Sequence, residues 1–149
     1  MTAIHNLPLL NLSLGGLSTE LTMLALAVAL GLFQLVIAAR AGNSQRGLSW
    51  NVGARDAAAP PVGKVAGRLE RSFRNFMETF PFFAALIVLC ALAGRHNWAT
   101  VWGAQLYLAA RILYLPLYGF GVPVLRTLVW LVATLSIILL LVALLYPAL

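Results

Sequence analysis

Four stretches of the chain are almost continuously apolar and are separated by more polar segments. They run from about residue 19 to 39, from 73 to 94, from 98 to 118 and from 122 to 146. Each has about the 20 residues that a helix needs to cross a bilayer core. None shows the alternation of a membrane barrel strand. Because only helices and closed barrels satisfy their backbone hydrogen bonds in lipid, the pattern predicts an all-α membrane protein, a bundle of four transmembrane helices.

The composition agrees with one membrane domain that comprises residues 1–149. Of the 149 residues, 62% are hydrophobic and 9% are charged, whereas about 25% are charged in soluble domains. The net charge of +6 does not indicate nucleic-acid binding, because the positive residues lie at the ends and inner faces of apolar helices. Residues 1–17 contain no Lys or Arg, so we expect no signal peptide.

Positive residues are concentrated between the first and second apolar stretches. Seven Lys and Arg lie from Arg40 to Arg74, and Gly, Pro and Asn residues predict a long loop over residues 41–70. Arg126 follows the turn at 119–125. The positive-inside rule therefore places both loops in the cytoplasm and both termini outside. The alanine-rich composition resembles that of bacterial proteins, for which the membrane is the inner membrane.

The second stretch begins with a polar stripe. At about 100° per residue, Arg71, Arg74, Asn75 and Glu78 fall on one helix face. Each ionisable group at membrane depth costs about 2.5–3.5 kcal/mol, so the stripe serves either helix packing or a polar ligand. Arg74 and Glu78 lie one turn apart and are able to pair. Two arginines and one glutamate leave a cation that a purely structural pair does not need.

The third stretch carries a second polar face. Tyr107, Arg111, Tyr114 and Tyr118 share it, at spacings of 4, 3 and 4 residues. Arg111 requires an anion inside the membrane, and Glu78 is the nearest candidate in composition. One interpretation is an Arg111–Glu78 bridge with the tyrosines as packing. The other is that the tyrosines, above all Tyr114 and Tyr118, donate hydrogen bonds to a ligand.

The fourth stretch opens with Arg126 and Thr127, one turn before Trp130. A cation at a helix start opposes the helix dipole. Arg126 is therefore either a charge that sets the topology or an anion binder that, beside a hydroxyl, stabilises a thiolate.

The remaining reactive residues give no sign of a metal site. Cys90, the only cysteine, lies in an apolar run and is predicted to be a small buried hydrophobe. His5 and His96 are isolated and flank the spans, and no His, Cys and carboxylate set has metal-ligand spacing. His96 is predicted to be a solvated loop residue.

Two segments carry a family resemblance. Residues 67–81 (GRLERSFRNFMETFP) and 110–118 (ARILYLPLY), followed by Leu125, Arg126 and Thr127, resemble the MAPEG family, the membrane-associated proteins in eicosanoid and glutathione metabolism. The resemblance implies a homotrimer that binds glutathione between neighbouring subunits near the cytoplasmic face. It implies Arg126 as thiolate stabiliser with Thr127 beside it, and Arg40 as a further contact. The implied binding residues, with Arg111 added from its shared face, are Arg71, Arg74, Asn75, Glu78, Arg111, Tyr114 and Tyr118.

The resemblance and the polar surface together favour one function. Guanidinium groups bind carboxylates bidentately, and Glu78 is able to take an ammonium group, which suits a zwitterion such as glutathione. Tyr114 and Trp130 stand where the prostaglandin synthase of the family has His and Tyr, which argues against prostaglandin synthesis. We expect a glutathione transferase or peroxidase acting on hydrophobic electrophiles from the bilayer. The alternative is a non-catalytic membrane scaffold or lipid-binding subunit of the same fold. A transporter is less favoured, because no paired broken helices are seen.

Overall fold

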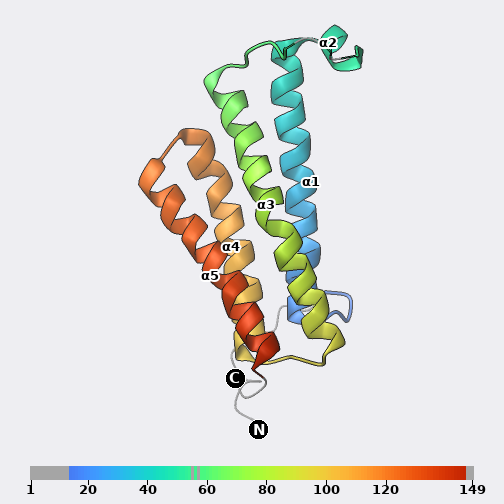
Figure 1. Cartoon of the computed structure of the whole chain (residues 1–149), viewed down its shortest axis with the longest axis vertical. Helices are drawn as coiled ribbons and strands as arrows, with labels where there is room; N and C mark the ends of the chain where they lie inside the picture. The colour runs from blue at the N-terminus through green and yellow to red at the C-terminus, as the bar shows by residue number, and fades with distance from the viewer. Residues whose placement is uncertain (1–13, 55, 57, 147–149) are drawn as a thin grey trace.

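The computed structural model describes residues 14–54, 56 and 58–146, and every structural statement below concerns these residues. His5 and most of the segment without Lys or Arg lie outside them. The helices are α1 (Thr19–Arg46), α2 (Leu48–Val52), α3 (Lys64–Leu92), α4 (Trp98–Phe120) and α5 (Pro123–Leu145), and the described residues contain no strand. The four long helices run side by side, and α1 begins and α5 ends at the end of the bundle that carries the α3–α4 connection (Figure 1).

The helix surfaces are those of an integral membrane protein. Three helices, α1, α3 and α5, are long and apolar enough to cross a membrane. Large apolar side chains point outward along them; Leu32, Phe33 and Leu135 are 55–61% exposed. Soluble monomers rarely expose apolar surface on this scale. Helix α4 has 23 residues and contains Arg111 and Gln105, so a fourth span stays a prediction.

The predicted loop over residues 41–70 is wrong in extent. α1 continues to Arg46, α2 covers Leu48–Val52, and α3 begins at Lys64. Helices α1 and α3 thus extend beyond the apolar stretches. Outside the lipid, polar residues do not prevent a helix from continuing. An ion pair at 2.5 Å between Arg46 and Glu70 and a bond from the Gly63 amide to the Gln45 side chain (2.5 Å) join the two extensions.

Small residues set how closely the helices approach. α1 packs on α3 and α4 packs on α5, while α3 also contacts α4 and α5. A Cβ on Gly31 would lie 2.8 Å from the Phe76 ring, and one on Gly103 would lie 2.9 Å from Leu140. Such contacts between small and large residues are typical of helix packing in membranes.

Local caps fix the two ends of α4. Asn97 accepts bonds from the Ala99 and Thr100 amides and forms a capping box that starts the helix. Gly121 ends it in the left-handed conformation (φ 78°). Pro123 then starts α5, so the turn places the first residues of α5 beside the last turn of α4.

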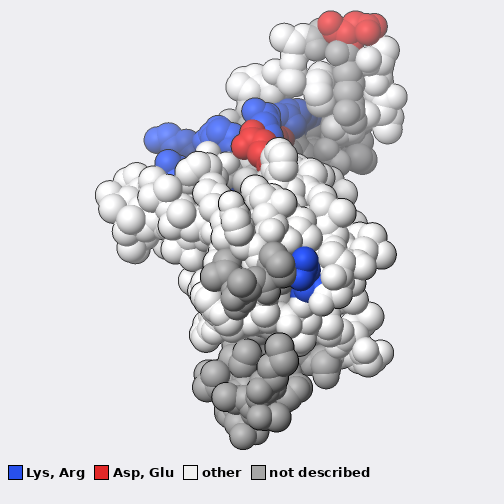
Figure 2. All heavy atoms as spheres, turned by 60° about the horizontal axis from the view of Figure 1, so that its bottom comes forward, with Lys and Arg blue, Asp and Glu red and all other residues white. Residues whose placement is uncertain are grey.

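Charge is distributed unequally along the bundle. Figure 2 shows Lys and Arg gathered mainly toward the end that carries the α1–α3 connection, with one separate blue patch lower on an otherwise uncharged surface. The cations of α1 and α3 at this end are Arg40, Arg46, Lys64, Arg68, Arg71 and Arg74. This asymmetry is the one on which the predicted orientation rests.

Candidate functional site

A cavity of about 210 Å³ lies where α3, the last turns of α4 and the first turns of α5 meet. Five predicted site residues line it together with Trp130; the lining is Asn75, Tyr114, Tyr118, Arg126, Thr127 and Trp130. Three helices therefore contribute a guanidinium, an amide, two phenols and a hydroxyl to one small volume.

The arginine of this cavity lies against an aromatic ring. The Arg126 guanidinium carbon is 4.6 Å from the centroid of the Tyr118 ring, and the Tyr118 and Tyr114 rings are 5.4 Å apart. A cation over a ring face is attracted by the ring quadrupole, which restrains its position. The Thr127 hydroxyl donates to the Pro123 carbonyl at 3.1 Å, so a bond from Thr127 to a ligand sulfur requires that hydroxyl to rotate.

Arg111 lies behind the cavity and is 1% exposed. Its guanidinium donates to Asn75 Oδ1 at 2.8 Å and to Thr79 Oγ1. It is also 5.5 Å from the ring centroids of both Tyr107 and Tyr114. Arg111 thereby fixes the orientation of Asn75 and joins α3 to α4.

The predicted ion pairs of Glu78 are wrong for the described residues. Neither Arg111 nor Arg74 forms an ion pair with it there; instead Glu78 Oε2 accepts from Asn75 Nδ2 at 3.3 Å. The reason is geometric, because Asn75 and Thr79 lie four residues apart on one face of α3 and both accept from the Arg111 guanidinium. Glu78 is exposed rather than interior.

The other charged residues of the stripe do not enter the cavity. Arg71, Arg74 and Glu78 are exposed on α3, and Arg40 is exposed on α1. Arg74 lines a separate, mostly apolar groove of about 470 Å³ between α1 and α3, which the Arg46–Glu70 ion pair borders.

Several polar contacts escaped the sequence interpretation. Thr79 accepts from Arg111 and is 3.2 Å from the Tyr107 hydroxyl, and its position one turn after Asn75 on the stripe is a signal that could have identified it. The Arg46–Glu70 pair joins residues 24 apart on different helices, so no local pattern indicates it. Tyr107 is fully buried and stacks on Phe83 at 3.9 Å, as the packing interpretation predicts.

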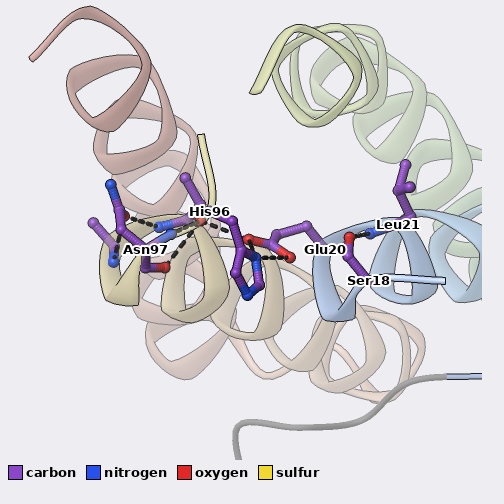
Figure 3. A network of polar contacts seen from close by, with 7 residues as sticks. Ser18, Glu20, Leu21, His96 and Asn97 are labelled. Atoms are coloured by element: carbon purple, nitrogen blue, oxygen red, sulfur yellow. Dashed lines mark hydrogen bonds and ion pairs between the residues drawn. The ribbon is translucent and has the colours of Figure 1, made fainter. Parts of the chain in front are cut away.

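A second polar network lies at the opposite end of the bundle (Figure 3). Glu20, at the start of α1, is 3% exposed, and its carboxylate is 2.7 and 3.0 Å from His96 Nδ1. The His96 side chain is 58% exposed in the α3–α4 connection, as predicted for a solvated loop residue, and its Nδ1 lies against the buried Glu20 carboxylate. Cys90 is buried, as predicted. Within the described residues no His, Cys and carboxylate group could hold a metal ion.

Comparison with known proteins gives one finding for the whole chain. The sequence profile of the MAPEG family matches residues 23–146, which include all four long helices in large part and every residue of the cavity. No curated protein matches the chain.

Proposed function

We propose, from the premise that the chain belongs to the MAPEG family, that it is a glutathione transferase or peroxidase embedded in the membrane. The family supports a membrane protein of glutathione or eicosanoid metabolism. Our proposal adds four spans, a homotrimer, glutathione as co-substrate and a hydrophobic electrophile that enters from the bilayer. The observation that carries it is the cavity in which Arg126, Tyr118, Tyr114 and Asn75 meet.

The size of the cavity supports binding between subunits. About 210 Å³ is less than the 300–1,000 Å³ of typical small-molecule sites. The cavity of one chain is therefore suited to the thiol end of glutathione. Its carboxylates would meet the exposed guanidinium groups of α3 and α1, and its ammonium group would meet Glu78, once a second copy brings these surfaces together. The candidates for this outer part are Arg40, Arg71, Arg74 and Glu78.

The chemistry we assign to Arg126 is stabilisation of the thiolate. A free thiol has a pKa of about 8.5 and is mostly protonated at neutral pH. A guanidinium about 5 Å from the sulfur, at an effective dielectric constant of about 20, favours the anion by about 3 kcal/mol. The thiol proton leaves to water. The sulfur then forms a bond to the electrophilic carbon as a leaving group such as halide departs, or it attacks the peroxide, whose O–O bond breaks to release an alcohol. In the second case a second glutathione converts the sulfenic acid to the disulfide and water. Thr127 would add a hydrogen bond to the same sulfur after its hydroxyl rotates.

The orientation we propose places the α1–α3 connection and the α4–α5 turn in the cytoplasm. The gathered cations at that end follow the positive-inside rule. Glutathione in the cytoplasm would then reach the Arg126 cavity directly, while a lipophilic substrate would approach between the helices.

The test is the Arg126→Gln variant, with Lys64→Gln as a control that removes an exposed charge outside the cavity. At saturating glutathione, we expect Arg126→Gln to lose thiolate absorbance and to turn over an aryl halide at least about tenfold more slowly, because a loss of about 3 kcal/mol shifts thiol ionisation by about 100-fold. Lys64→Gln should match the wild type.

Thermal stability separates the enzyme from a non-catalytic scaffold. Glutathione at 100 times its Kd should stabilise the protein in detergent by about 2.7 kcal/mol. A wild-type protein that glutathione does not stabilise at all refutes the proposal. Binding with unchanged thiolate signal and turnover in Arg126→Gln would reduce Arg126 to a topology marker.

A further inference from the structure

A second cavity, of about 370 Å³, lies at the end of the bundle opposite the Arg126 cavity. It is formed by the start of α1, the last turn of α3 and the α3–α4 connection, and Glu20, Arg95 and His96 supply its charged or titratable groups together with Cys90. Its volume lies in the range of small-molecule sites. Nothing in the proposed reaction uses it.

The acid in this cavity already has its partners. Glu20 accepts from His96 and from the Thr100 hydroxyl, the latter at 2.6 Å. Figure 3 shows the His96 ring lying directly against the Glu20 carboxylate. A carboxylate with these partners does not need a cation from outside, so Glu20 does not select the ligand.

In contrast to Glu20, the Arg95 guanidinium has a buried donor that forms no hydrogen bond among the described residues. Arg95 Nε is inaccessible to solvent and has no hydrogen-bond partner among the described residues. The backbone holds Arg95 in place, because its amide bonds to the Cys90 carbonyl at 2.8 Å around Gly94, whose φ is 63°. A buried donor without an acceptor is costly, and an anion is the ligand that would satisfy a guanidinium.

The walls and the depth of the cavity indicate the rest of the ligand. Leu21, Ile87 and Ala91 form much of its apolar lining. Nearby, Trp98 is 44% exposed and Leu92 is 81% exposed. Tryptophan is enriched where the bilayer meets water, so this cavity lies at the level of lipid headgroups with apolar surface beside it.

We propose that this cavity binds an anionic phospholipid, with the headgroup phosphate on Arg95 and the beginning of an acyl chain against Leu21, Ile87 and Ala91. The lipid belongs to the leaflet opposite the Arg126 cavity. The Glu20 carboxylate already bonds to Thr100 and lies against His96, so it does not offer its oxygens to the ammonium group of a zwitterionic headgroup, and the unpartnered Arg95 donor favours an anionic headgroup.

The experiment uses the full chain in detergent micelles that contain phosphatidylglycerol, phosphatidylcholine or inorganic phosphate. Native mass spectrometry counts bound lipid, and the melting temperature without lipid confirms that each variant is folded. The variants are Arg95→Gln, which removes the phosphate partner, Ala91→Phe, which fills the apolar part, and Lys64→Gln, a charge control at the other end.

Both lipids present a phosphate to Arg95, but only phosphatidylglycerol carries a net negative charge. We expect the wild type and Lys64→Gln to bind phosphatidylglycerol about tenfold more tightly than phosphatidylcholine. Arg95→Gln should lose that preference, and Ala91→Phe should lose the bound lipid while keeping the charge. Equal binding of the two lipids by the wild type, or an unchanged preference in folded Arg95→Gln, overturns the proposal. Inorganic phosphate that displaces phosphatidylglycerol at equal concentration would identify a free-anion site instead of a lipid site.

Discussion

Arg111 offers the sharpest test of how the polar interior is held together. It is almost fully buried, and its guanidinium bonds to the neutral side chains of Asn75 and Thr79 rather than to Glu78. An Arg111→Met substitution keeps a long apolar side chain and removes both bonds. The change therefore removes the donor from Asn75 Oδ1, which is partly buried, whereas Thr79 Oγ1 keeps the Tyr107 hydroxyl at 3.2 Å.

The magnitude follows from opposing contributions. Two hydrogen bonds to a charged group contribute about 1.5–3 kcal/mol each, and two ring contacts at 5.5 Å contribute about 0.5–1 kcal/mol each. Removing a buried charge returns several kcal/mol of desolvation free energy. We expect a net loss of about 2 kcal/mol in the free energy of unfolding.

The assay is a pair of double-mutant cycles, because they separate partners that a single variant does not. Denaturant titrations in detergent at fixed protein concentration would combine Arg111→Met with Asn75→Ala and, separately, with Glu78→Gln. We expect a coupling of about 1–2 kcal/mol to Asn75 and less than about 0.5 kcal/mol to Glu78. A coupling to Glu78 that exceeds the coupling to Asn75 would refute the hydrogen-bond network and restore the ion pair.

Three further outcomes are expected. Glu78→Gln should lower stability by less than about 1 kcal/mol, because the exposed carboxylate has one bond at 3.3 Å, yet weaken glutathione binding; calorimetry that finds full affinity would exclude Glu78 from the site. Gly121→Ala should destabilise by about 1–2 kcal/mol, because its φ is 78°, whereas the control Gly119→Ala meets no atom within 4 Å; equal melting temperatures would contradict this. Cysteines introduced at Ser44 or Ser49 should resist impermeant thiol reagents in intact cells, and ready labelling would invert the proposed orientation.

The regular elements could be predicted from the sequence wherever lipid constrains them. Four apolar stretches anticipated the four long helices, and the predicted starts near residues 19 and 98 agree with Ser18 and Asn97 as caps. The boundaries failed where the chain leaves lipid. The apolar stretch ends at Arg40, but the helix does not end until Arg46. A polar residue marks the end of a bilayer span, whereas it does not by itself end a helix in water.

The candidate cavity was anticipated in part, and for a physical reason. Tyr114 and Tyr118 lie one turn apart on a helix face, so periodicity alone places them together. Whether these tyrosines lie near Asn75 and Arg126 depends on how α3, α4 and α5 cross. Periodicity does not predict that crossing, and only the family resemblance placed these residues in one site. The Glu20–His96 contact joins residues 76 positions apart. From sequence, a single acid at a helix start is explained by its favourable interaction with the helix dipole. No sequence pattern therefore indicates that Glu20 contacts His96.

The choice of neutral partners for Arg111 links the packing of the bundle to the ligand we propose. A buried guanidinium that is bonded only to an amide and a hydroxyl regains part of its lost hydration but forms no ion pair among the described residues. Asn75 and Tyr114, which contact Arg111, also line the cavity, so an anion there would lie close to this charge as well as to Arg126. A thiolate or carboxylate in the cavity would then supply the counter-charge that the described helices do not place in an ion pair with Arg111. The same residue therefore joins α3 to α4 and favours an anionic ligand between α4 and α5.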